Sequence, residues 1–221
     1  MAAATSAPDP AQYLREGFES MDNNSVISAF GSGKSTTVRR FFSFFILGAM
    51  ALMSTGSVAA WSGDDETTNT EVAILAGGCF WGMEGLIRDL DGVVDTEVGY
   101  AADGNDKKAE PAEAIRIDFD PERISYEDIL RFYFKMHDPT TINRQGNDRG
   151  AEYRSAIFVL SDKQRQIAEK VRDDVDASGF WKKPVVTEIS EAGKFKEAAD
   201  HHQDYLEKNP GGYTCHYVRG E

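Results

Sequence analysis

From Glu71 onward the chain alternates short apolar runs with stretches of helical periodicity. The run Val72–Ala76 is continuously apolar and ends at two glycines, a pattern typical of a buried strand. The next stretch, Met83–Leu90, places apolar residues at helical spacing and predicts an amphipathic helix.

The same pattern continues through the rest of the chain, and Ser125 is suited to cap a helix that begins beside it. Alternation of this kind predicts an α/β (α+β) fold, a two-layer sandwich with a ferredoxin-like core in which helices cover a mixed central sheet. The further predicted strands are Val94–Tyr100, Glu113–Phe119, Tyr153–Leu160 and Val185–Ile189, and the further predicted helices are Ser125–Met136, Asp162–Asp176 and Phe195–Glu207.

The first seventy residues lack this alternation. Residues 1–40 are rich in Ala, Ser, Asp and Asn, which predicts a disordered tail. Residues 41–60 contain no charged side chain, and twenty such residues are about the length that crosses a bilayer. A cleaved targeting segment and a retained single-span membrane anchor both fit this run, and residues 61–70 are predicted to form a linker.

Charges on the two sides of residues 41–60 suggest an orientation. Arg39 and Arg40 precede the run, whereas Asp64, Asp65 and Glu66 follow it. The positive-inside rule would leave the following domain on the far side of a membrane. We therefore expect an organelle or an extracytoplasmic location, in a plastid or the secretory pathway, with a possible membrane tether.

Composition narrows the class of protein. The chain has 24 basic and 37 acidic residues and a formal net charge of −13. Nucleic-acid binding requires a basic face, so no nucleic-acid partner is expected. The two cysteines, Cys79 and Cys215, are too few to form a zinc-finger or iron–sulfur ligand set on their own. Composition does not give the oligomeric state, and a monomer is the default expectation. The reaction that the family resemblance described below implies needs no metal and no organic cofactor.

Cys79 follows the first predicted strand at the point where a helix begins. Free backbone N–H groups at a helix start stabilise an anion, so this position favours a thiolate of lowered pKa. Phe80 and Trp81 offer two apolar faces between which a methyl group would pack. A buried, inert cysteine in a core corner is the alternative that position alone leaves open.

The block Gly77–Glu84, with the sequence GGCFWGME, resembles the signature of the type A peptide methionine sulfoxide reductases. The resemblance covers nearly all of residues 72–218 and implies reduction of methionine S-sulfoxide to methionine. Other blocks follow in the order of that family: Val98–Tyr100, Ala112–Ala114, His137–Thr140, Asn143–Asp148, Tyr153–Ile157 and His202-Gln203.

The resemblance implies a role for several side chains. Cys79 would be the nucleophile toward sulfur, and Glu113 the proton donor to oxygen, which requires a dry site that raises the pKa of its carboxyl group. Tyr153 would hold the substrate oxygen and Asp148 would orient the substrate. Phe80 and Trp81 would form the methyl pocket.

The second cysteine lies in the glycine-rich tail of the predicted catalytic domain, residues 71–221. Attack on the sulfoxide leaves a sulfenic acid on Cys79, which a second thiol converts to a disulfide. A mobile tail would bring Cys215 to Cys79 as the resolving cysteine. The resemblance implies that thioredoxin or a similar dithiol reduces the pair, and that the substrate is methionine sulfoxide in oxidised proteins, with free methionine sulfoxide as a further substrate.

Residues 101–111 depart from the family pattern. The loop is shorter, a second tyrosine that shares the substrate oxygen is missing, and Pro111 stands where the family has a histidine. Loss of a hydroxyl donor would slow the chemical step. The alternative function is therefore a weakly active or inactive homologue that binds sulfoxides or senses thiol oxidation.

Overall fold

The computed structural model describes residues 69–220. The predictions for residues 1–40 and 41–60 lie outside this range, as does all but the end of the predicted linker 61–70. Within residues 69–220, no helix is long and apolar enough to cross a membrane.

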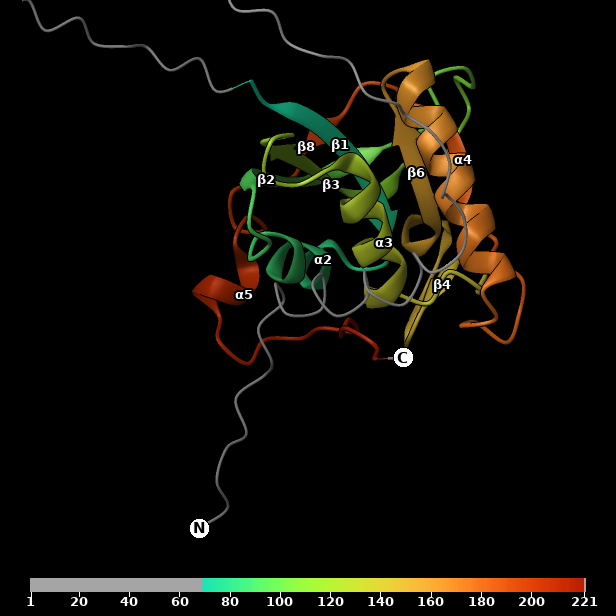
Figure 1. Cartoon of the computed structure of the whole chain (residues 1–221). Helices are drawn as coiled ribbons and strands as arrows, with labels where there is room; N and C mark the ends of the chain where they lie inside the picture. The colour runs from blue at the N-terminus through green and yellow to red at the C-terminus, as the bar shows by residue number, and fades with distance from the viewer. Residues whose placement is uncertain (1–68, 221) are drawn as a thin grey trace, which may run out of the picture. The chain divides into compact units, whose positions relative to one another are not determined.

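A six-stranded mixed sheet forms the centre of the fold, in the order β7-β6-β1-β3-β2-β8 (Figure 1). All neighbouring strands are antiparallel except β6 and β7, which are parallel. This confirms the predicted mixed sheet. The strands are β1 (Glu71–Gly77), β2 (Val93–Ala101), β3 (Ala112–Phe119), β6 (Ser155–Val159), β7 (Glu188–Glu191) and β8 (Lys196–Glu197).

Four of these strands and two helices follow the order βαββαβ, and the strands lie in the sheet as β6-β1-β3-β2. This is the ferredoxin-like arrangement expected from the sequence. β1 lies between β3 and β6, and both of its faces are buried because Ala73 and Leu75 pack in the cluster on the helix side and Ile74 and Ala76 in the cluster on the opposite side. Its continuous apolar run reflects that central place.

The helices are α2 (Phe80–Ile87), α3 (Tyr126–Met136), α4 (Asp162–Ala177) and the short α5 (Tyr205–Lys208). Ser125 caps α3: its hydroxyl accepts from the backbone N–H of Asp128, whose carboxylate in turn accepts from the backbone N–H of Ser125. α2, α3 and α4 bury their apolar sides against one face of the sheet in one hydrophobic cluster (Figure 1). The helices and the sheet thus form the two predicted layers.

The opposite face of the sheet has a smaller core of mostly small side chains. Ile74, Ala114 and Phe158 belong to it, and Ala192 and Phe195 from the chain after β7 pack against it. The C-terminal part of the chain therefore covers the face that the helices leave open.

The predicted helix Phe195–Glu207 is wrong. β8 pairs there with β2, and α5 is a single turn at the end of the segment. The side-chain amide of Gln203 explains the difference, because it accepts from the backbone N–H of Val98 at 2.8 Å and donates to the carbonyl of Val98 at 2.9 Å. These bonds dock the segment on the edge of β2, and they depend on tertiary contacts that helical periodicity does not contain.

Two strand boundaries also differ from the predictions. β7 begins at Glu188 because the backbone N–H groups of Val185 and Val186 bond instead to Asp176 and Pro139. Tyr153 is the last residue of a 3-10 turn, η1 (Ala151–Tyr153), just before β6. A two-stranded ribbon of β4 (Arg144–Gln145) and β5 (Asp148–Arg149) precedes that turn.

Candidate active site

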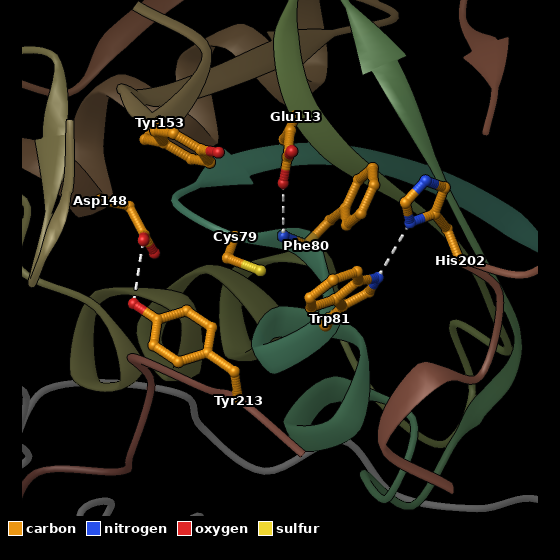
Figure 2. Close-up of a pocket in the computed structure, with 8 residues that line it drawn as sticks. All are labelled: Cys79, Phe80, Trp81, Glu113, Asp148, Tyr153, His202 and Tyr213. Atoms are coloured by element: carbon orange, nitrogen blue, oxygen red, sulfur yellow. Dashed lines mark hydrogen bonds between the residues drawn. The ribbon is translucent and has the colours of Figure 1, made fainter. Parts of the chain in front are cut away.

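A cavity of about 280 Å³ opens at the end of β1 where α2 begins (Figure 2). Side chains that are far apart in the sequence line this cavity, and they include all six of the predicted catalytic and substrate-binding residues. The lining residues are Cys79, Phe80, Trp81, Glu113, Asp148, Tyr153, His202 and Tyr213.

Cys79 is the N-cap residue of α2, as the sequence predicted, and its side chain is 6% exposed. The predicted lowering of its pKa is wrong for the unliganded protein. The pKa of the Cys79 thiol is raised to about 11, chiefly by burial and also by the nearby carboxylates of Glu113 and Asp148, against the opposing effect of the backbone N–H groups of Trp81 and Gly82. Loss of hydration outweighs the helix start, so the resting thiol is protonated at neutral pH.

Glu113 lies on β3 beside Tyr100 of β2, its partner in the strand register. Its carboxylate Oε2 accepts the backbone N–H of Phe80 at 3.1 Å (Figure 2). Burial raises the pKa of Glu113 to about 7, with Asp148 and Glu152 adding to the increase. A dry site with a carboxyl group able to exchange a proton near neutrality is what the sequence analysis required of this residue.

Phe80 and Trp81 form the apolar wall of the cavity. Phe80 is 2% exposed, and its ring meets the edge of Tyr100 with the centroids 5.8 Å apart. The Trp81 ring stacks on Tyr205 at 3.8 Å, and its Nε1–H donates to Nδ1 of His202 at 3.2 Å. The indole plane is therefore fixed by two residues from the C-terminal segment.

Asp148 and Tyr213 close the other side of the cavity. The Tyr213 hydroxyl donates to Oδ1 of Asp148 at 2.9 Å (Figure 2). Oδ2 of Asp148 is buried and has no hydrogen-bond partner in the described part of the chain. An acceptor of this kind is available to a donor group of a bound molecule.

Tyr153 directs its hydroxyl into the cavity from the 3-10 turn (Figure 2). Burial and the charge of Glu113 both raise the pKa of Tyr153, so the hydroxyl keeps its proton. No residue of the loop 101–111 lines the cavity. The loop ends beside Tyr153, where the Glu110 carbonyl accepts from Arg154 at 2.8 Å, and Glu113 still faces the cavity.

Cys215 is a free, half-buried thiol next to the site. Burial and the neighbouring Asp148 raise its pKa to about 12, while the backbone N–H of Cys79 acts in the opposite direction. The two thiols are therefore neighbours in the reduced protein, although 135 intervening residues separate them in the sequence. Residues 69–220 contain no group of three or more His, Cys, Asp or Glu side chains that could hold a metal ion.

Sequence reasoning did not assign His202, Tyr205 and Tyr213 to the site. His202 and Tyr205 lie in a segment predicted to be helical, and Tyr213 lies in the tail. The available signals were the family block that contains His202 and the aromatic character of Tyr205 and Tyr213, but only the folded tail shows that these residues meet Trp81 and Asp148.

The cavity combines a cysteine with a carboxyl group, and comparison with known proteins identifies the chain as an oxidoreductase and gives its family. The profile of the family described as "Peptide methionine sulfoxide reductase" matches residues 71–221. A relative from Leifsonia xyli subsp. xyli, named peptide methionine sulfoxide reductase MsrA, is 57% identical over 157 residues, which are 68% of this chain and 92% of the relative. The chain belongs to the peptide methionine sulfoxide reductase family.

Solved structures show the same relationship. Mxr1 from Saccharomyces cerevisiae in its reduced form matches with a TM-score of 0.63 and 34% identity, covering 68% of this chain and 93% of that chain. Mxr1 in complex with Trx2 matches with a TM-score of 0.51 and 27% identity, covering 68% and 91%.

Proposed function

We propose that this chain reduces methionine S-sulfoxide to methionine with Cys79 as nucleophile and Glu113 as the group that moves the proton. The observation that supports this most strongly is the shared cavity: the thiol and a carboxyl group with a pKa of about 7 line the same buried space. The sulfoxide sulfur needs a nucleophile and its oxygen needs a proton, and the two side chains provide one each.

In the proposed reaction the Cys79 thiolate forms a bond to the sulfoxide sulfur while the sulfoxide oxygen takes up a proton. Above pH 7 the pair holds one proton, mainly on the Cys79 thiol because that pKa is about 11. Glu113 receives this proton and delivers it to the oxygen. The oxygen then moves to Cys79 as a sulfenic acid and the thioether leaves as methionine.

The walls of the cavity support selection of one sulfoxide epimer. Phe80 and Trp81 would enclose the methyl group, and the Tyr153 hydroxyl would donate to the oxygen. Asp148, held by Tyr213, would accept a donor group of the substrate backbone through its free oxygen. The methyl group and the oxygen would then each have a fixed place. With both places fixed, only one of the two sulfoxide epimers presents its sulfur to Cys79.

Cys215 is the proposed resolving residue. It condenses with the Cys79 sulfenic acid to a disulfide and releases water. Thioredoxin or a similar dithiol then reduces the disulfide, which the complex of the related Mxr1 with Trx2 supports. Oxidised proteins supply the methionine sulfoxide.

The test is epimer-resolved reduction by the full chain with a dithiol. Wild type is expected to consume S- but not R-methionine sulfoxide, and Cys79→Ser is expected to abolish the reaction. The alternative, a sulfoxide-binding or redox-sensing homologue with the short loop, would instead bind the S epimer or form the Cys79–Cys215 disulfide with oxidant and show no turnover.

A further inference from the structure

His216 follows the resolving cysteine and is one of the most buried polar residues of the described chain, at 6% exposure. Its Nε2 lies 2.8 Å from the carbonyl oxygen of Gly77 at the end of β1. A carbonyl oxygen only accepts, so Nε2 carries the ring hydrogen. Burial lowers the pKa of His216 to about 4, and the ring is neutral at physiological pH. Its Nδ1 is therefore an unprotonated acceptor.

That acceptor faces a reacting atom. Nδ1 of His216 lies 3.5 Å from Sγ of Cys215, within hydrogen-bond range for sulfur, and the thiol is the donor in this contact because Nδ1 has no hydrogen. The Asp148 carboxylate is a second acceptor beside the same thiol. The thiol needs such a partner. Burial and the neighbouring Asp148 raise the pKa of Cys215, so the thiol form predominates at pH 7.

The tail is held over the first turn of α2, which starts at Cys79. A Cβ atom on Gly82 would come within 2.5 Å of His216 Nδ1 and would also strike the Thr214 hydroxyl. The Thr214 hydroxyl oxygen in turn accepts from the backbone N–H of His216 at 3.1 Å. The absence of a side chain at Gly82 thus lets the residues on both sides of Cys215 pack against the nucleophile's helix.

We propose that His216 is a catalytic residue of the resolving step, with Nδ1 accepting the proton of the Cys215 thiol. As Sγ of Cys215 attacks Sγ of the Cys79 sulfenic acid, the S–S bond forms and the S–O bond breaks. His216 passes the proton to the departing hydroxide, which leaves as water. Cys215 is oxidised and the sulfenic sulfur of Cys79 is reduced. The inference rests on the proposed function of the two cysteines.

Two substitutions of His216 distinguish the roles of its two ring nitrogens. His216→Gln retains an N–H that reaches the Gly77 carbonyl but has no acceptor at the Nδ1 position. His216→Asn places an amide oxygen near the Nδ1 position but does not reach Gly77. If the proton acceptor matters, Gln impairs resolution more than Asn; if His216 only packs the tail, Asn impairs it more.

The experiment is a single turnover of the full chain with S-methionine sulfoxide and no external reductant. Methionine release reports the first step, and loss of the Cys79 sulfenic acid reports the second. His216→Gln is expected to release methionine within about twofold of the wild-type rate and to form the disulfide about 100-fold more slowly, the lower range for a lost general base. The matched control is the exposed His201, whose change to Gln is expected to alter neither rate.

Disulfide formation by His216→Gln at the wild-type rate would overturn the inference. Asp148, the other acceptor near Cys215, would then be the candidate proton acceptor. A wild-type chain that releases no methionine would instead refute the proposed function. Nitrogen NMR of the ring in the wild-type chain needs no variant: the proposed role of His216 requires hydrogen on Nε2 and none on Nδ1 at neutral pH, and the opposite tautomer contradicts that role.

Discussion

Glu113 accepts the backbone N–H of Phe80, the residue after Cys79, at 3.1 Å. This bond ties the carboxyl group on β3 to the start of α2, so two elements that are distant in sequence share one proton-exchanging site. Burial raises the pKa values of both groups, and the charge of Glu113 also raises the pKa of Cys79, so the two side chains titrate as a pair.

The pH profile of the first step follows from that coupling. The reactive state holds one proton, so the rate of methionine release is expected to rise as the pH passes about 7 and to fall only near pH 11. Rapid-quench measurement of methionine from the full chain across this range is the test. A rate that falls steadily from pH 6 to pH 9 would contradict the shared-proton scheme.

Tyr153→Phe should slow the first step. In this cavity Tyr153 is the proposed donor to the sulfoxide oxygen, and loss of one oxyanion-type donor costs about 3 kcal/mol in other enzymes. A decrease of about 100-fold in the single-turnover rate is expected, with little change in the disulfide-forming step. Tyr217→Phe is the control, because Tyr217 is 61% exposed and does not line the cavity. Equal rates for Tyr153→Phe and wild type would remove Tyr153 from the mechanism.

Gly82→Ala is predicted to separate the two steps in another way. The new Cβ would collide with Thr214 and His216 and displace the tail, while the nucleophile and Glu113 stay in place. Methionine release should continue, and disulfide formation should slow by at least tenfold. Gly220→Ala, where a Cβ meets nothing within 4 Å, is the control. Normal disulfide formation by Gly82→Ala would show that the packed tail is not required.

Glu84 is expected to make stability pH-dependent. It is 1% exposed, its Oε2 accepts the backbone N–H of Asp204 at 2.8 Å, and Oε1 has no hydrogen-bond partner among the described residues. Burial raises its pKa from 4.5 to about 7. The folded state therefore binds more protons than the unfolded state between these values, and the free energy of unfolding falls as pH rises through that window.

Glu84→Gln removes this titration. Between pH 5 and pH 8 the free energy of unfolding of the variant should therefore rise, relative to that of wild type, by up to about 3 kcal/mol. Urea unfolding at the two pH values measures the difference. Glu207→Gln, at an exposed residue of α5 rather than a buried one of α2, is the control and should keep the wild-type pH dependence. If the free energy of unfolding of Glu84→Gln changed with pH as that of wild type does, ionisation of Glu84 would not destabilise the folded state.

Most of the fold could be predicted from the sequence because its signals are local. The buried strand Val72–Ala76, the glycines after it and the Ser125 cap lie within a few residues of the structure they determine. The segment after β7 could not be predicted in this way. Its conformation depends on the Gln203 amide bonding to Val98, a contact across 105 positions.

The site shows the same division. The motif and the resemblance indicated Cys79, Glu113, Asp148 and Tyr153, and the cavity contains them together. The predicted lowering of the Cys79 pKa was wrong because the sequence indicates the start of a helix but not how deeply the thiol is buried. Tyr213 and His202 reach the cavity only through the packing of the C-terminal segment.

The most direct test of the central claim is a single turnover of the full chain with S-methionine sulfoxide, comparing wild type with Glu113→Gln and with the exposed Glu110→Gln. Glu113→Gln keeps an acceptor for the Phe80 N–H but cannot move a proton, so its rate of methionine release should fall by about 100-fold or more. Glu110→Gln should match wild type. Full activity in Glu113→Gln would contradict the account, because the oxygen would then receive its proton from another group.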